Sequence, residues 1–216
     1  MSNRREVRYL HDLQMEIRAE ETEERGAEIT GYPIVFEQEI DMGEWREVID
    51  AGSTGDGSVL RDVALIVNHD WDMLPLARSR RNNDNSTMQL KADQRGVAMR
   101  ARLDTENNPR AKEAYSAVNR GDIIGMSFAF IVNEERWEDL DTEKPLRRIM
   151  SFARIFEVSL VTDPAYPGTS VQVASEGEAL ESVRASLERE RKQLEEERNR
   201  EQEKERREKA LGVLRK

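Results

Sequence analysis

The sequence predicts a mainly β protein, built as an antiparallel β-barrel or sandwich and followed by a charged C-terminal helix. Short segments alternate apolar and polar residues and are separated by Gly, Pro, Asn and Asp, which is typical of strands joined by turns. Before this C-terminal helix only one segment carries helix start and stop signals, so the sequence does not show the alternation of strands and helices that βαβ units have. The last 40 or so residues change abruptly to Glu, Arg and Lys, as in an exposed helix.

The N-terminal third contains three expected strands. Residues 1–12 are charged and are expected to form a flexible N-terminus. Residues 13–17 alternate apolar and polar side chains and predict a short strand. A second strand is expected over residues 27–36, where Pro33 indicates a bulge or an edge position. Residues 44–49 predict another strand or turn, followed by a Gly- and Ser-rich loop.

The middle of the chain predicts two strands, a hairpin and a helix. Residues 63–69 alternate so that His69 stands where a buried strand ends, and residues 74–79 continue extended. The turn DQRG joins residues 87–91 to 97–103 as a hairpin. Residues 109–120 predict a helix, because Asn108 is a good N-cap, Pro109 suits the first helical position and Gly121 suits the C-cap.

The segment 121–132, GDIIGMSFAFIV, predicts a strand with two different faces. Large apolar side chains from Ile124 to Val132 form one face, and Gly125, Ser127 and Ala129 form the other. After an expected polar loop over 133–144, residues 147–161 predict a long strand that becomes apolar on both faces. The segment DPAYPGT at 163–169 ends it.

The expected domains are a flexible segment over residues 1–12, a β domain over 13–175 and a helical extension over 176–216. In the extension Leu180, Val183, Leu187 and Leu194 follow a heptad that is interrupted by Glu190. A solvated helix is the first interpretation, and weak pairing with another helix, hence a homo-oligomer, is the second. Residues 176–216 carry 12 acidic and 12 basic side chains, so the whole net charge of −10 belongs to the body.

Composition excludes several classes of function. An acidic body is repelled by phosphate and by anionic lipid, so we expect neither a nucleic-acid nor a membrane partner. The sequence has no cysteine, which removes thiolate catalysis, disulfides and Cys-based zinc sites and is consistent with a reducing cytoplasm. Neither a membrane span nor a signal peptide is evident, so a soluble, intracellular protein is expected. No cofactor is expected.

Three side chains could form an acyl-transfer site. Ser127 lies among small residues that leave room for a substrate, and His69 is the available base because His11 lies in the charged N-terminus. A serine becomes nucleophilic when a base takes its proton, and a third group orients that base. Glu157 lies within the apolar run RIFEVSLV, where a carboxylate needs a partner.

Simpler interpretations stay open at this point. Ser127 could be just a small residue on a crowded sheet face, and Glu157 could pair with a structural arginine, Arg154 or Arg148. Asp70 and Asp72 follow the strand that ends at His69 and could bind a metal, but two alternate acids are common on solvated surface, so no metal site is expected. The motif around Ser127 is not the nucleophile elbow of α/β-hydrolases.

Five stretches resemble the prohead maturation proteases of tailed bacteriophages, serine peptidases whose fold resembles herpesvirus assemblin. They cover roughly residues 13 to 173 in the family's order and read GYPIVFE, VNHDWDMLPLARS, LKADQRGVAMRARL, GDIIGMSFAF and FEVSLVTDPAYPGTSV. The resemblance implies an assemblin-like antiparallel β-barrel with His69 and Ser127 as the catalytic pair. Herpesvirus proteases have a second histidine at the third position; here a carboxylate must replace it, with Glu157 preferred and Asp163 the alternative. Backbone N–H groups around residues 162–166 are the candidate oxyanion hole.

The same resemblance implies a role in capsid maturation. Such an enzyme, packaged inside the procapsid in the host bacterial cytoplasm, cleaves the scaffold or the scaffolding segment of the major capsid protein, and often itself. The capsid protein and the scaffold are therefore the expected partners. The rival hypothesis is a non-catalytic scaffolding factor that binds capsid protein, since charge-rich helices are also typical of scaffolds.

Overall fold

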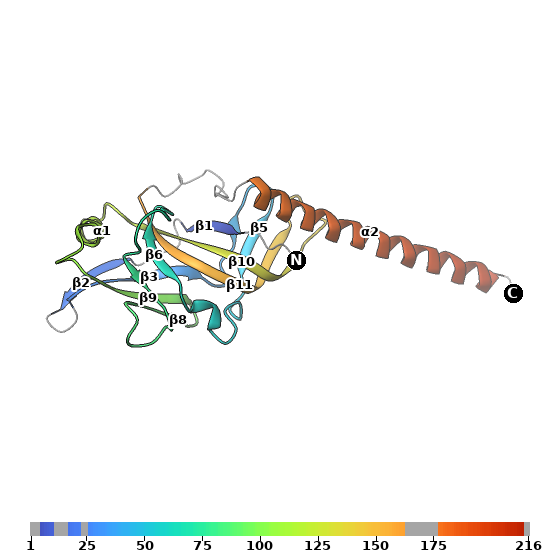
Figure 1. Ribbon diagram of the computed structural model, residues 1–216. Helices are drawn as coiled ribbons and strands as arrows, with labels where there is room; N and C mark the ends of the chain where they lie inside the picture. Colours follow the sequence, from blue (N-terminus) through green and yellow to red (C-terminus); the bar gives the residue numbers. More distant parts are fainter. Residues whose placement is uncertain (1–4, 11–16, 23–25, 163–176, 214–216) are drawn as a thin grey trace.

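The computed structural model describes residues 5–10, 17–22, 26–162 and 177–213 (Figure 1). Within them the chain forms strands β1 (Glu6–Leu10), β2 (Arg18–Thr22), β3 (Gly26–Val35), β4 (Ile40–Asp41), β5 (Arg46–Ile49), β6 (Ala64–Val67), β7 (Ala77–Arg78), β8 (Met88–Ala92), β9 (Gly96–Leu103), β10 (Gly125–Glu138) and β11 (Leu146–Val161). The helices are the short 3₁₀ helix η1 (Ser58–Leu60), α1 (Pro109–Arg120) and α2 (Gly177–Val213). The protein is thus mainly β with a C-terminal helix.

The strands form two sheets that pack against one core. One sheet has seven strands, with the order β1-β10-β11-β5-β4 and with β6 and β7 joined beside β11; the other has the order β2-β3-β9-β8. The core between them is apolar and includes Ile29, Leu65, Met99, Phe128 and Phe130. Over the described residues neither sheet closes on itself, so the expected barrel is not seen.

The expectation of antiparallel pairing throughout was wrong at β11. This strand pairs in parallel with β5 through Leu146–Ile149 and with β6 through Glu157–Leu160, while it runs antiparallel to β10. Its 16 residues are long enough to take β5 and β6 one after the other along the same edge. Residues 157–161 are all buried, so both faces of this part of β11 are covered, as its apolar sequence predicts.

Two segments that the sequence predicts to be irregular are strands. Residues 6–10, expected to be flexible, form β1 on the free edge of β10. Residues 133–138, expected to lie in a loop, continue β10, which pairs with β11 as far as Glu138. Both are rich in charged residues, and several of these also pair with distant parts of the chain. The strand expected over 13–17 lies mostly outside the described residues.

Helix α1 forms as its local signals predict. Asn108 Oδ1 accepts hydrogen bonds from the N–H groups of Arg110 and Ala111, and Gly121 ends the helix with a positive φ of 77°. Ala111, Ala114 and Val118 bury its inner face, and Gly121 then leads directly into β10. The helix therefore fixes where the Ser127 strand begins.

Helix α2 packs its first turns on the body and then leaves it (Figure 1). Val183 and Leu187 lie in a second small core with Met42, Trp45 and Trp137. Beyond Leu187 nearly every described side chain is exposed, as the solvated interpretation expects. None of the described helices is both long and apolar enough to cross a membrane.

Candidate active site

His69 is held by a strained turn at the end of β6. Asn68 and His69 both have positive φ angles, 49° and 58°, and Asp70 N donates to Val67 O over 3.0 Å, as in a two-residue turn of the primed type. Asn and His are among the residues other than glycine that adopt this backbone conformation most often, but it still costs free energy at each position. Asn68 Oδ1 also accepts from Thr162 N over 3.0 Å, which ties the turn to the end of β11. The turn therefore points the imidazole back over the sheet.

The imidazole of His69 contacts Glu157. Nδ1 lies 2.6 Å from Glu157 Oε1, and the backbone N–H of His69 donates to Ser159 Oγ over 2.9 Å. Glu157 is fully buried, and 14% of the His69 side chain is exposed. A carboxylate can only accept, so in the neutral ring Nδ1 carries the proton and Nε2 is the basic nitrogen.

The arginines considered as partners of Glu157 are engaged elsewhere. Arg148 pairs with Glu37 over 2.9 Å and with Glu138 over 3.1 Å. Arg154 lies over the ring of Phe156, 4.6 Å from its centroid. Among the described contacts the imidazole is the partner that Glu157 has, which supports the histidine interpretation of this buried carboxylate.

Ser127 lies on β10 in the same patch of the sheet. Ser127 lies opposite Ser159 of β11, and Ala129 lies opposite Glu157. Because paired residues and residues two apart point to the same side of a sheet, Ser127, Ser159 and Glu157 share one face. Ser127 is fully buried, and its hydroxyl donates to the carbonyl oxygen of Arg8 on β1 over 2.7 Å. A hydroxyl has one proton, so while Ser127 donates to Arg8 that proton is not given to a base.

A family model described as Caudovirus prohead serine protease matches residues 13–183. The chain belongs to this family. The comparisons with curated proteins and with solved structures find no match. The family match covers the strands that carry Ser127, His69 and Glu157, and it begins after β1.

The other predicted site residues are less well placed or lie outside the described residues. Asp163 and residues 163–166 of the candidate oxyanion hole belong to the latter group. The N–H of Thr162 already donates to Asn68 Oδ1. Asp70 Oδ1 accepts from Asp72 N over 3.1 Å, and the described residues contain no group of three or more side chains that could hold a metal ion.

A pocket of about 450 Å³ opens beside the histidine turn of this prohead protease family member. Asn68, Asp70 and Thr162 line its near side, and the rest is lined by β6, the segment after the histidine turn, α1 and the segment before β10. Its walls are formed by Ile66, Val67, Met73, Leu74, Leu76, Ala114, Ala117 and Ile123, with Arg110, Glu113 and Asp122 also among the lining residues. A surface with both apolar and charged residues can accept a side chain of a bound peptide.

A buried charge cluster lies under β1. Arg147 contacts Glu6, Glu47 and Glu135 over 2.5–2.9 Å, and Arg8 contacts Glu6 and Glu47 over 2.5–2.7 Å. Burial alone raises the pKa of Glu6, but the charges and hydrogen bonds of Arg147 and Arg8 outweigh it and lower that pKa to about 2. The two carboxylates raise the pKa of Arg8 despite its burial.

Sequence reasoning missed Ser159, Arg8 and this cluster. Ser159 follows Glu157 by two residues in the motif EVSLV, and that spacing places both side chains on one face, so a period of two could have found it. Glu47 gave no local signal, because its partners Arg8 and Arg147 are 39 and 100 positions away, and the local pair of Arg8 with Glu6 does not show that both side chains are buried.

Proposed function

We propose that this chain is a serine endopeptidase that cleaves the scaffold, or the scaffolding segment of the major capsid protein, and also itself, during phage procapsid maturation. Ser127 is the nucleophile, His69 the general base and Glu157 the carboxylate that orients the base. The enzyme acts inside the procapsid in the host cytoplasm. Pairing through the exposed part of α2 would make it a homo-oligomer.

The observation that carries this proposal is the buried contact between His69 Nδ1 and Glu157 Oε1 at 2.6 Å, on the sheet face that also holds Ser127. A buried carboxylate that accepts from one imidazole nitrogen fixes the tautomer and stabilises the cation that forms when the other nitrogen takes a proton. A purely structural domain has no need to place an imidazole in this way. The family match over residues 13–183 gives independent support.

The chemistry follows from these positions. His69 Nε2 takes the proton of Ser127 as Oγ attacks the carbonyl carbon of the scissile peptide bond. The protonated imidazole then gives that proton to the leaving amine, which departs and leaves an acyl ester on Ser127. Water attacks the ester with the same base assisting, and the carboxyl product leaves. Glu157 stays ionised throughout and balances the charge of the imidazolium.

The first prediction tests the nucleophile. Co-expression with the cognate capsid protein should give processing by the wild type and none by Ser127→Ala, because loss of the nucleophile removes many orders of magnitude of rate. Gel electrophoresis and mass spectrometry of the capsid protein measure this. Ser53→Ala is the matched control, since Ser53 is also a buried serine and its hydroxyl makes no hydrogen bond within the described part of the chain. Processing by Ser127→Ala at the wild-type rate would end the serine-protease proposal.

A second candidate function is a non-catalytic scaffolding factor. The observation that favours it is the complete burial of Ser127, whose hydroxyl is bonded to the chain's own Arg8 carbonyl. The long, exposed and charged half of α2 is also suited to binding other helices. Capsid protein that the wild type never cuts, and that assembles equally well with the wild type and with Ser127→Ala, would support this second function.

A further inference from the structure

β1 is an edge strand that covers Ser127 and lies outside the family match. Among the described strands it pairs only with β10, so it can leave without breaking any other of these strand pairings. The family match begins at residue 13, beyond β1. Ser127 is fully buried while β1 is in place. Any peptide that reaches the Ser127 hydroxyl from this edge therefore has to take the place of β1.

The backbone of β1 lies as an extended peptide would lie on the edge of a sheet. Residues 6–10 pair antiparallel with Met126–Phe130 in an unbroken register, with Tyr9 opposite Ser127. The carbonyl of Arg8 is the group that accepts the Ser127 hydroxyl over 2.7 Å. Strand addition of this kind gives affinity through main-chain hydrogen bonds, and specificity through pockets for alternate side chains.

The side chains of Glu6 and Arg8 lie on one face of β1, two residues apart. Both contact the buried pair Glu47 and Arg147. Glu47 accepts two hydrogen bonds from Arg8, at 2.5 and 2.7 Å, and Arg147 donates two to Glu6, at 2.7 and 2.9 Å. All four side chains are at most 3% exposed. The guanidinium of Arg8 also lies over the ring of Phe130, 5.3 Å from its centroid.

Without β1 the buried charges around Glu47 and Arg147 do not balance. Glu47, Glu135 and Arg147 stay behind, with two carboxylates around one guanidinium. Glu47 then lacks the cation that it binds in two places, and Arg147 lacks one of its anions. An incoming strand restores both contacts when it carries an acidic residue and, two positions later, an arginine, because that spacing puts both side chains on one face.

We propose that the free edge of β10, with Glu47 and Arg147 beneath it, is a binding site for an extended peptide of the pattern acidic residue, any residue, arginine, and that residues 6–8 occupy this site in the resting chain. The peptide's arginine carbonyl then lies at Ser127 Oγ in place of the Arg8 carbonyl. This inference rests on the proposed function, since it names the substrate class of the same site. It also explains why the candidate nucleophile is covered in the resting chain.

Peptide binding by the full-length chain tests the proposal. The probe is a fluorescein-labelled hexapeptide, Arg-Glu-Val-Arg-Tyr-Leu, which copies residues 5–10. Arg8→Ala removes the arginine that holds β1 down and should bind the probe roughly tenfold or more tightly than the wild type, because the site is then open for a larger fraction of the time. Fluorescence anisotropy measures the two affinities. Arg136→Ala is the control. It removes an exposed arginine of β10, the strand that β1 pairs with, and should bind the probe as the wild type does.

Two further arms make the result decisive. A probe with the charges exchanged, Arg-Lys-Val-Glu-Tyr-Leu, should bind none of these proteins. Val7→Pro removes a backbone N–H from β1 and leaves every charge in place, so it should open the site as Arg8→Ala does. If Arg8→Ala and Val7→Pro both fail to fold, as judged by melting curves, β1 is an integral strand and the proposal is wrong.

The remaining outcomes separate this proposal from the protease itself. Equal binding of the probe by the wild type, Arg8→Ala and Val7→Pro, or no binding by any of them, overturns the peptide site even if capsid processing still depends on Ser127. Conversely, the binding arm needs no catalysis. Tight binding by both β1 variants would therefore support the site even if Ser127→Ala processes capsid protein normally.

Discussion

The side chain whose role depends most on its neighbours is Glu157. A carboxylate without any exposed surface is costly unless it is paired, and here its partner is the imidazole of His69 at 2.6 Å. Oε2 of the same carboxylate makes no hydrogen bond within the described part of the chain. The site thus buries an ionisable group that has one hydrogen-bonding partner, an arrangement more typical of a catalytic site than of a stabilising ion pair.

Our prediction for this residue is that Glu157→Gln folds but loses activity. The amide keeps the shape of the carboxylate but removes its charge and can favour the wrong imidazole tautomer, so capsid cleavage should fall on the order of a thousandfold or more. A melting curve beside the cleavage assay separates catalysis from folding.

Asp163→Asn is the control for this prediction, because Asp163 is the alternative third residue. We expect it to have the milder effect on cleavage. If Asp163→Asn is inactive while Glu157→Gln cleaves normally and stays folded, the orienting role belongs to Asp163.

At the level of single residues, sequence reasoning reached as far as local signals allow. His69 could be placed at a strand end because the apolar alternation stops there, but its strained turn depends on the bond between Asn68 and Thr162, 94 positions apart. The alternation predicts that Ile124 shares one face with the large apolar side chains of its strand, yet 61% of it is exposed, because β10 begins only at Gly125. Periodicity cannot show where a strand starts to be covered.

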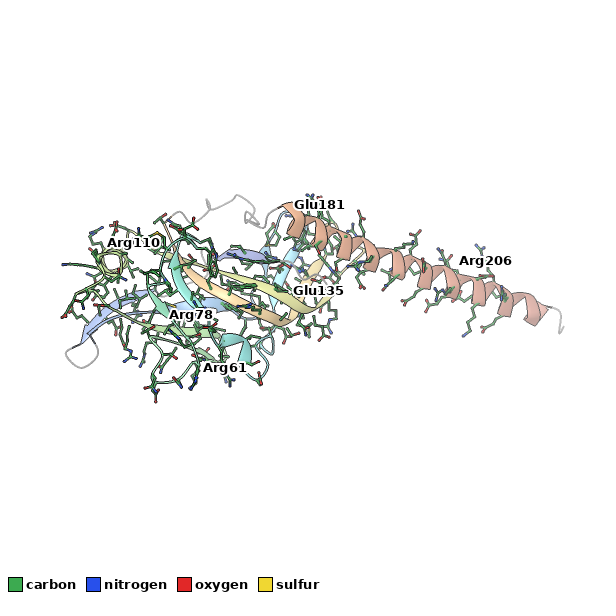
Figure 2. The ribbon with its side chains drawn as sticks, in the orientation of Figure 1. Arg61, Arg78, Arg110, Glu135, Glu181 and Arg206 are labelled. Atoms are coloured by element: carbon green, nitrogen blue, oxygen red, sulfur yellow. The ribbon has the colours of Figure 1, made fainter. Side chains whose placement is uncertain are left out.

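Among the elements, α2 differs most from the expectation of a solvated helix. Trp137 Nε1 donates to Ser186 Oγ over 3.1 Å, and Ser186 in turn donates to Glu135 on β10. Figure 2 shows Glu135 in the part of the body nearest the start of α2, while Arg206 lies far out along the helix. The first turns of α2 are therefore part of the folded body, whereas the remainder extends beyond it. The expected domain boundary near residue 175 stays a prediction.

Leu187→Ala should destabilise the body, because Leu187 packs with Trp45 and Trp137. The loss of a large buried side chain should cost roughly 2–5 kcal/mol of unfolding free energy. Denaturant unfolding followed by tryptophan fluorescence measures it, since two of the three tryptophans lie in this small core.

Leu194→Ala is the matched control, two turns further along the same helix. Leu194 lies only partly buried among exposed neighbours, so its removal should change stability little. Equal effects of the two substitutions would mean that α2 contributes no more at its start than along its exposed half.

The elements that sequence could predict are those whose stabilising contacts are local. Helix α1 was predicted with its bounds and caps because Asn108, Pro109 and Gly121 act within a few residues of the backbone they cap. β1 was missed because its charges are stabilised by Glu47 and Arg147, which are far away in the sequence. The parallel partners of β11 were missed for the same reason, since β5 and β6 are far from β11 in the sequence and no local pattern shows which strands pair.

Over the whole molecule, the buried charge cluster joins the N-terminal strand, both long strands and the C-terminal helix. Arg147 on β11 contacts Glu6 on β1, Glu47 on β5 and Glu135 on β10, and Glu135 accepts from Ser186 on α2. The breaking of such a cluster is costly, because it leaves charges buried without partners. The state of one carboxylate can therefore affect how firmly β1 covers Ser127.

Acid should weaken this cluster through Glu6. The folded chain lowers the pKa of Glu6 from 4.5 to about 2. A group with a lowered folded pKa stabilises the fold above its unfolded pKa, and that contribution is lost as pH falls from about 4.5 toward 2. We therefore predict that Glu6→Gln is less stable than the wild type at pH 7, and that this difference shrinks steadily across that interval. Thermal melts of both proteins at closely spaced pH values measure it.

Glu143→Gln is the control for the acid titration, because Glu143 is an exposed carboxylate in the loop after β10. Its stability should follow that of the wild type at every pH. A stability difference between Glu6→Gln and the wild type that stays constant from pH 7 to pH 2 would show that Glu6 does not hold its place through its charge.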